Sequence, residues 1–354
     1  MTTSLLAGPA ACSVDAPATW RALFDGHAVS LTDRTFQPGA VAPDGSRVFG
    51  TLHEGEMASL AELTAKGPKV ISPLVNEPDS SGLPASQVAA IAFDGRWLVW
   101  NPMFGDSEAS SRTEVLDTQS GVRFALDRPD PFASQQVYAL DAGRLVWWSS
   151  TSTAQTLHLT TLADRHDTVI ATNARLGGAA LVGDLVLYVD PAGRDQSGTL
   201  HAATTTTGAA TDVPAPLRAV RHVFDVESSA DTVAWVEFVG GRIALHTWRI
   251  GQDTITTPYV NADSSMTNVS LTGVTGDLVT FTAQEGLNAA DVVINGYVAS
   301  ASGGATVRLP SGYRPAVANG DALVVVRLDD PRGGAPSEAA VVSARALPPA
   351  ATCG

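Results

Sequence analysis

The segment Phe93-Asp94-Gly95-Arg96-Trp97-Leu98-Val99-Trp100 decides the fold, because it joins a tight Asp-Gly turn to a dense apolar strand. Glycine accepts positive φ and aspartate tolerates it, so an Asp-Gly pair favours a hairpin turn. Turn and strand recur in seven copies, whose first apolar residues are Val48, Leu98, Leu145, Leu185, Val233, Leu278 and Leu323. Successive copies are 40 to 50 residues apart, a spacing typical of four-stranded propeller blades.

The rest of each repeat supplies three more strands. In the copy quoted above, an apolar segment at 88–91 precedes the turn, an alternating segment follows at 113–117, and a last segment lies at 122–126. Alternation bounded by turn residues predicts a meander of four antiparallel strands. A β-sandwich with chance spacing is the alternative, and seven copies in phase argue against it. We therefore expect an all-β fold, a seven-bladed β-propeller of four-stranded antiparallel meander blades.

The first copy of the repeat carries a family resemblance. Its sequence, Ala42-Pro43-Asp44-Gly45-Ser46-Arg47-Val48, resembles the repeat signature of TolB-like propellers, which pairs a Pro-Asp-Gly turn with an apolar strand. The other copies keep the turn and strand without the full motif. The resemblance covers most of the chain at the level of the fold. It implies an architecture that serves many unrelated tasks, so it transfers no catalytic residues.

The repeats predict a single propeller domain over residues 20–354, after an extended tail at 1–19. The last repeat has only three clear strands, so a free strand at 27–31 is expected to close the ring. Residues 57–63 have helix propensity, but their place in the repeat predicts a strand, and propensity is the weaker signal. The expected blades are 38–86, 87–130, 131–174, 175–220, 221–264, 265–312 and 313–350.

Composition excludes several classes of partner. The 354 residues carry a formal net charge of −14 and only two lysines. Such a chain repels nucleic acid and anionic membranes, and no apolar run approaches the roughly 20 residues that span a bilayer. The arginine-rich, lysine-poor usage is typical of a high-GC bacterial genome. We expect a monomer without a transmembrane segment, whose partner is a protein or a carbohydrate.

The two cysteines, Cys12 and Cys353, lie near opposite ends of the chain. The two ends of a propeller meet where the ring closes, so we expect a disulfide there, which requires an oxidising compartment. Two free thiols in the tails are the alternative. The start of the chain lacks a basic segment typical of a signal peptide. We expect a secreted or periplasmic protein, with the cytoplasm as the alternative.

The predicted meander separates two faces. The Asp-Gly turns lie on one face, here called the turn face; the loops after each second strand and the connections between blades lie on the other, the loop face. The loop-face segments are longer and more charged, and functional residues concentrate on loops held by a rigid scaffold. The candidate ligand-binding residues there are Arg218, Arg221, Arg314, Asp190 and Asp329, and the candidate catalytic residues are His222 and Tyr313.

Among these, His222 stands out because two arginines precede it. A histidine beside arginines suits carboxylate or sulfate binding, or a base whose pKa is lowered; ordinary surface charge is the alternative. His158, His201 and His246 fall on third strands, where structural roles are expected. No metalloprotease motif, Cys-x-x-Cys pair, nucleophile elbow, P-loop or dinucleotide-binding loop occurs, so we expect no metal and no cofactor.

The sequence is compatible with two functions. The first is an exported binding or scaffold protein that engages a protein or glycan through the charged loop face. The second is a glycan-active enzyme, a lyase or hydrolase at the channel mouth. In that case His222 is the base, Tyr313 the acid, and Arg218 or Arg314 the clamp for a substrate carboxylate. The sequence does not decide whether the protein is an enzyme.

Overall fold

The computed structural model describes most of the chain as antiparallel β-sheet. The described residues are 12–31, 35–54, 57–73, 85–104, 111–127, 134–151, 153–173, 175–191, 198–239, 242–261, 268–285, 292–330, 332 and 334–349. From β3 onward the strands fall into repeating units, in which the first strand pairs with the second and the second with the third. This confirms the predicted all-β fold and its four-stranded antiparallel sheets.

The strands occupy equivalent places in the repeat. First strands are β3 (Thr35–Val41), β7 (Ala85–Phe93), β11 (Ser134–Asp141), β15 (Ala179–Val182), β19 (Val223–Ser228), β23 (Val269–Thr275) and β27 (Tyr313–Asn319). Second strands are β4 (Val48–Glu54), β8 (Trp97–Phe104), β12 (Arg144–Ser150), β16 (Leu185–Pro191), β20 (Thr232–Val239), β24 (Leu278–Glu285) and β28 (Ala322–Leu328). Third strands are β5 (Met57–Thr64), β9 (Glu114–Asp117), β13 (Gln155–Thr161), β17 (Gly198–Thr204), β21 (Arg242–Arg249), β25 (Val293–Ser300) and β29 (Pro336–Ser343). Fourth strands are β6 (Gly67–Pro73), β10 (Arg123–Ala125), β14 (His166–Asn173), β18 (Ala210–Thr211), β22 (Thr256–Val260) and β26 (Ala305–Arg308). The strand β5 confirms that the repeat outweighs the helix propensity of residues 57–63.

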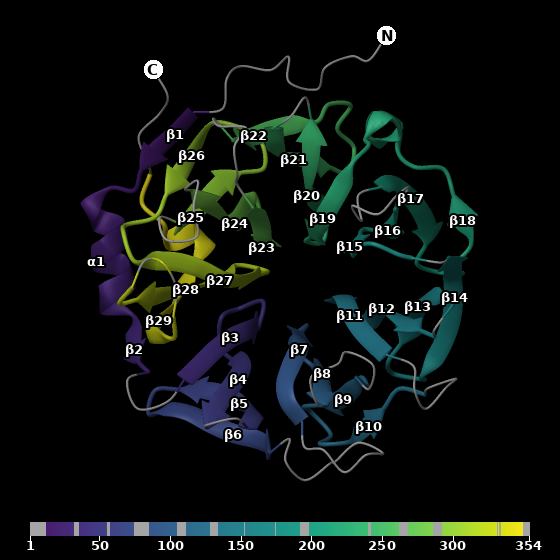
Figure 1. The fold of residues 1–354 in the computed structure, drawn as a ribbon, viewed down its shortest axis with the longest axis horizontal. Coiled ribbons are helices and arrows are strands. Elements are labelled where there is room, and N and C mark those ends of the chain that lie inside the picture. The colour runs from purple at the N-terminus through teal and green to yellow at the C-terminus, as the bar shows by residue number, and fades with distance from the viewer. Residues whose placement is uncertain are drawn as a thin grey trace.

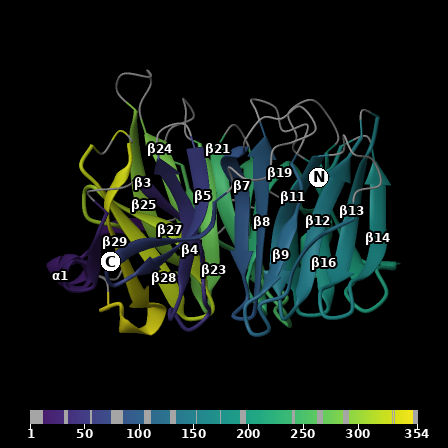
Figure 2. The same cartoon turned by 90° about the horizontal axis from the view of Figure 1, so that it is seen from below.

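The units stand around a common centre with their first strands innermost (Figure 1). Each first strand contacts the first strand of the following unit, and β27 contacts β3. The turns of the last and first units also touch: the amide of Asp321 donates to the carbonyl of Pro43 over 2.7 Å. Gly320 has a φ of +60°, and a Cβ there would lie 2.5 Å from Pro43. Seen from the side, the strands run between the two faces (Figure 2).

Six of the seven first strands, all but β15, share a distortion that the sequence did not predict. A β-bulge places one extra residue against the second strand and increases the local twist. The bulges lie between Pro38 and Ala40, Val88 and Ile91, Val137 and Ala139, Val223 and Asp225, Leu271 and Gly273, and Pro315 and Val317. Residues at these bulges, such as Tyr138 and Thr272, line the central cavity described below.

Tryptophans fill the spaces between neighbouring sheets. The side chains of Trp100, Trp147 and Trp235 are buried, with exposed fractions of 1%, 3% and 0%. Trp147 and its neighbour Trp148 belong to two different core clusters, because successive residues of a strand point to opposite faces. The tryptophans are therefore packing residues and not exposed platforms for sugar rings.

The N-terminal residues form a clasp, comprising β1 (Cys12–Asp15), the helix α1 (Ala18–Gly26) and β2 (Ala28–Ser30). β1 pairs in parallel with β26, and β2 pairs antiparallel with β29. α1 lies on the perimeter beside β29 (Figures 1 and 2). The clasp thus joins the last two units.

The helix α1 was not predicted, since residues 1–19 were expected to be extended and 20–37 to hold only the closing strand. Trp20 and Phe24 lie one helical turn apart and are buried, with Leu23 packed against the same core. This i, i+3, i+4 spacing is the signal that would have revealed the helix. Short 3₁₀ turns also occur, at η3 (Ala215–Ala219) and η4 (Ala344–Ala346). In the described part of the chain, no helix has the length and apolar character needed to cross a membrane.

Candidate functional site

Three of the predicted residues come together on the loop face. Arg218, Arg221 and His222 are exposed and lie on the connection that carries η3 from β18 to β19. One Arg221 Nη donates to the carbonyl of Arg218 over 2.8 Å. The His222 carbonyl accepts from the amide of Phe238 over 3.3 Å. Phe238 is one of the few exposed large apolar side chains among the described residues, with an exposed fraction of 52%. We call Arg218, Arg221, His222 and Phe238 the loop-face patch.

A buried carboxyl group lies beside this patch. Glu237 is 3% exposed. Burial raises the pKa of Glu237, and a hydrogen bond from the Trp235 indole and the charges of His222 and Arg221 partly offset the rise. The Nε of Arg218 donates to the carbonyl of Val213 over 3.1 Å. Backbone carbonyls and, for Arg218, the Asp212 carboxylate at 3.5 Å orient the two arginines, whose side chains stay exposed.

Tyr313 lies elsewhere, in the core between the last two units. Its hydroxyl donates to the carboxylate of Asp25 on α1, and its ring packs 5.5 Å from that of Phe24. Burial and the Asp25 carboxylate raise the pKa of Tyr313. The next residue, Arg314, donates from Nε to the carbonyl of Ile294 over 3.0 Å, and burial lowers its pKa. The structure describes no contact between Tyr313 and His222, and the catalytic roles stay predictions.

The two predicted aspartates are held by different neighbours. Asp190, in β16, lies 3.9 Å from Nε2 of His201. Asp329, just beyond β28, accepts from the hydroxyl of Ser337 over 2.9 Å. Among the described residues, no group of three or more His, Cys, Asp or Glu side chains could hold a metal ion. Much of the charged loop sequence around these positions lies outside the described residues.

The three third-strand histidines form a repeated packing motif. Each stacks on the aromatic residue directly opposite on the second strand: His158 on Trp147, His201 on Tyr188, and His246 on Trp235. Burial lowers the pKa of His246 to about 4, so it is neutral at pH 7. The repetition supports the structural roles expected for these histidines.

A second candidate site, which the sequence analysis missed, lies at the centre of the ring. A cavity of about 710 Å³ is bounded by the turn-face halves of the first strands, and we call it the channel cavity. Its wall is mostly small and apolar, with Gly39, Ala92, Ala139 and Ala318 as examples. Its acidic lining residues are Asp141, Glu227 and Asp231, and no Lys, Arg or His is among the described residues that line it. A cavity of this size and character suits a small molecule.

Two carboxyl groups on β19 have strongly perturbed pKa values. Burial raises the pKa of Glu227 to about 8, and the nearby Asp225 carboxylate adds to the rise. Burial raises the pKa of Asp225 to about 6, although the amide of Leu271 donates to its Oδ2 over 2.8 Å. The i, i+2 spacing places both carboxyl groups on the face of β19 turned towards β23. Two acidic residues alternating in an innermost strand were the available signal in the sequence.

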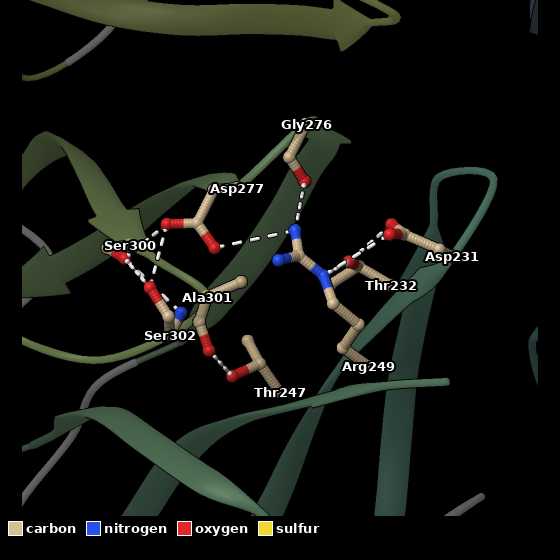
Figure 3. A network of polar contacts seen from close by, with 9 residues as sticks. All are labelled: Asp231, Thr232, Thr247, Arg249, Gly276, Asp277, Ser300, Ala301 and Ser302. Carbon is tan, nitrogen blue, oxygen red and sulfur yellow. Dashed lines mark hydrogen bonds and ion pairs between the residues drawn. The ribbon is translucent and has the colours of Figure 1, made fainter. Parts of the chain in front are cut away.

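The rim of the channel cavity carries an extended polar network (Figure 3). Arg249 lies between Asp231 and Asp277, with nitrogen–oxygen distances of 3.3 and 3.5 Å. Ser300 and Ser302 donate to the other oxygen of Asp277 over 2.7 and 2.8 Å. This network joins two neighbouring units on the turn face, and the Arg249 guanidinium is shared between the carboxylates of Asp231 and Asp277. It is therefore a structural connection.

The chain matches no protein-family model and no curated protein. Solved structures match it at the level of the fold. An oligogalacturonate lyase in complex with manganese is 11% identical, with a TM-score of 0.57 over 88% of this chain and 91% of the other. The RRP9 WD40 repeats are 13% identical, with a TM-score of 0.51 over 90% and 97%. A structure assigned to TolB from Agrobacterium tumefaciens is 11% identical, with a TM-score of 0.43 over 66% and 87%. The first two matches, whose TM-scores exceed 0.5, show that the chain has a β-propeller fold, as its sequence predicted.

Proposed function

We propose that this chain is a binding propeller that engages a protein or glycan partner through its loop face. The loop-face patch is the observation that carries the proposal. Arg218, Arg221 and His222 are exposed on one connection, and the His222 carbonyl accepts from the amide of Phe238, itself an exposed aromatic residue, on a chain whose net charge is −14. Aromatic residues and arginine are enriched where protein interfaces hold their partners. A partner that presents carboxylates suits this patch.

The architecture that presents the patch is part of the proposal. We propose one propeller domain over residues 20–354, with seven blades and a ring closed by the N-terminal strand. The pairing of β2 with β29 and the contact of β27 with β3 support it. We propose that the protein acts as a monomer and is secreted or periplasmic.

The alternative of a glycan-active enzyme rests on His222 and Tyr313 acting together. The Tyr313 hydroxyl donates to Asp25 in the perimeter core, whereas His222 lies exposed beside Phe238. Nothing in the described structure favours a shared active site for them. We therefore do not adopt this function.

The first prediction concerns the loop-face patch. The double substitution Arg221→Glu and Phe238→Ala is expected to weaken partner binding by about 10- to 100-fold, because it reverses one charge and removes the aromatic anchor. Partners would be captured on immobilised protein from the extracellular and periplasmic fractions and on a glycan array. Each would then be titrated by calorimetry against wild type and variant.

The matched control is Val169→Ala. Val169 is 56% exposed and lies on the outer strand β14, away from the patch. It should leave binding unchanged. A partner that binds the double variant as tightly as the wild type would refute the patch as the binding surface.

The predicted disulfide gives a second test. Cys353 lies outside the described residues, so the bond stays a proposal. It is supported by the absence of a free thiol at Cys12, in β1 of the clasp. Replacing both cysteines with serine is expected to lower the free energy of unfolding by about 2–4 kcal/mol, measured by urea titration. Non-reducing mass spectrometry of the exported protein should show the linked peptides, and two free thiols there would remove both the disulfide and the argument for export.

A further inference from the structure

Two polar side chains that line the channel cavity, Glu227 and Ser229, have no hydrogen-bond partner among the described residues. Most other polar side chains of its wall are engaged. The Ser228 hydroxyl donates to the carbonyl of Leu181 over 2.6 Å, and that of Thr272 to Thr280 over 2.8 Å. The Asn319 amide donates to two backbone carbonyls, those of Val41 and Phe93, over 3.0 and 2.9 Å. These groups are committed to holding the inner strands together.

The acidic residues of the cavity wall also divide into those that have a partner and one that has none. Asp141 pairs with Arg144 over 2.8 Å, and Asp231 pairs with Arg249 over 3.3 Å. The carboxyl group of Glu227 has no hydrogen-bond or ion-pair partner among the described residues. Glu227 is partly buried, and a partly desolvated carboxylate without a partner is destabilised relative to its protonated form. Among the acidic residues of the described wall, Glu227 is therefore the one without a basic partner.

The residues that line the channel cavity limit which kind of ligand could pair with the Glu227 carboxylate. No basic side chain lines the cavity in the described part of the chain, so an anionic ligand would meet only carboxyl groups. A bare metal ion needs several oxygen ligands, and no group of three acidic or histidine side chains is present among the described residues. The volume of about 710 Å³ also greatly exceeds that of an ion. An organic cation with an apolar stem can pair with the Glu227 carboxylate through its charge and contact the small apolar side chains of the wall through its stem.

We propose that the channel cavity binds a primary ammonium group on an apolar stem, with the ammonium paired to the Glu227 carboxylate. The stem lies against the alanine and glycine positions of the first strands, such as Ala92, Ala139 and Gly273. Asp225, two residues away on β19, adds negative potential, although its Oδ2 already accepts from Leu271. This site is at the turn-face end of the channel, so it is independent of the loop-face patch.

Binding should be linked to the protonation of Glu227. The titratable or charged groups around it are Asp225 on its own strand, Tyr138 on β11, and the ion-paired Asp141 and Asp231 at the rim. In the free protein the raised pKa of Glu227 keeps its carboxyl group protonated at pH 7. An ammonium ligand favours the carboxylate, so the carboxyl proton passes to the buffer while the ligand keeps its charge. Close to one proton should be released per ligand bound.

The test uses n-hexylamine as the probe and isothermal calorimetry on the full chain. We expect sub-millimolar binding of n-hexylamine at pH 7, and no binding of hexanoate. Hexan-1-ol, which has the same stem without the charge, should bind at least about 10-fold more weakly. Comparing phosphate with a non-amine buffer of different ionisation enthalpy reports the released proton. Amine buffers are avoided, since they are ligands of the proposed class.

The variant Glu227→Gln keeps the shape of the side chain and removes its charge. This variant should weaken the binding of n-hexylamine by about 10- to 100-fold and abolish the proton release. Asp253→Asn, which removes an exposed charge on the turn face, should leave both unchanged. Equal binding of n-hexylamine and hexan-1-ol, no proton release in the wild type, or no binding at about 10 mM probe would overturn the proposal. The wild-type measurements stand even if the variant fails to fold.

Discussion

Glu227→Gln is expected to raise the free energy of unfolding by up to about 4 kcal/mol at pH 8, and by little at pH 4. Burial raises the pKa of Glu227 from 4.5 to about 8 in the folded protein. Between these values the unfolded chain has lost the proton and the folded chain keeps it, so wild-type stability falls as the pH rises. A shift of one pKa unit corresponds to about 1.4 kcal/mol. Glutamine cannot ionise, so the stability of the variant does not fall with pH through this group.

The measurement is a series of urea titrations from pH 4 to pH 9 in buffers without amines. The wild-type curve should decline through this window, with Asp225 adding to the decline at its acidic end because burial raises the pKa of Asp225 to about 6. The Glu227→Gln curve should decline less. Asp253→Asn should follow the wild type within about 0.5 kcal/mol. Parallel wild-type and Glu227→Gln curves would show that the Glu227 carboxyl group is not desolvated.

The second large effect is expected at the clasp. Phe24 is fully buried, and its ring contacts those of Trp20 and Tyr313 at 6.3 and 5.5 Å. Phe24→Ala should lower the free energy of unfolding by about 3–5 kcal/mol, because it removes a large side chain from a closed core and leaves a cavity. The change would be measured from the urea midpoint at constant slope.

The control for this prediction lies on the same helix. Arg21 has an exposed side chain and a long contact of 3.8 Å to Asp25, so Arg21→Ala should change stability by less than about 1 kcal/mol. If α1 simply detached, Trp20 fluorescence would change before the main transition, since the Trp20 indole would lose its 2.7 Å hydrogen bond to the Pro348 carbonyl. A loss no larger than that of Arg21→Ala would contradict a structural role for the clasp.

Local patterns predicted the propeller because its elements are local. Each Asp-Gly or related turn is followed by its apolar strand, and the register of pairs such as Val48 with Val41 and Leu98 with Phe93 follows from the hairpin. The helix α1 was not predicted, because it occurs once and is not part of the repeated pattern. The candidate catalytic residues His222 and Tyr313 are separated in the structure because the direction of each side chain depends on neighbours from other units.

The sequence by itself determined the repeating strands, the two faces and the structural roles of the third-strand histidines, because turn chemistry and alternation act over a few residues. Only the tertiary structure decided the channel cavity, the isolation of the Glu227 carboxyl group and the binding of Tyr313 to Asp25. These features arise where segments far apart in the chain meet: β19 approaches β23 and the other first strands, and the N-terminal clasp covers the last two units. Desolvation and pairing of a charge depend on everything that surrounds it, and the linear order of residues does not record that environment.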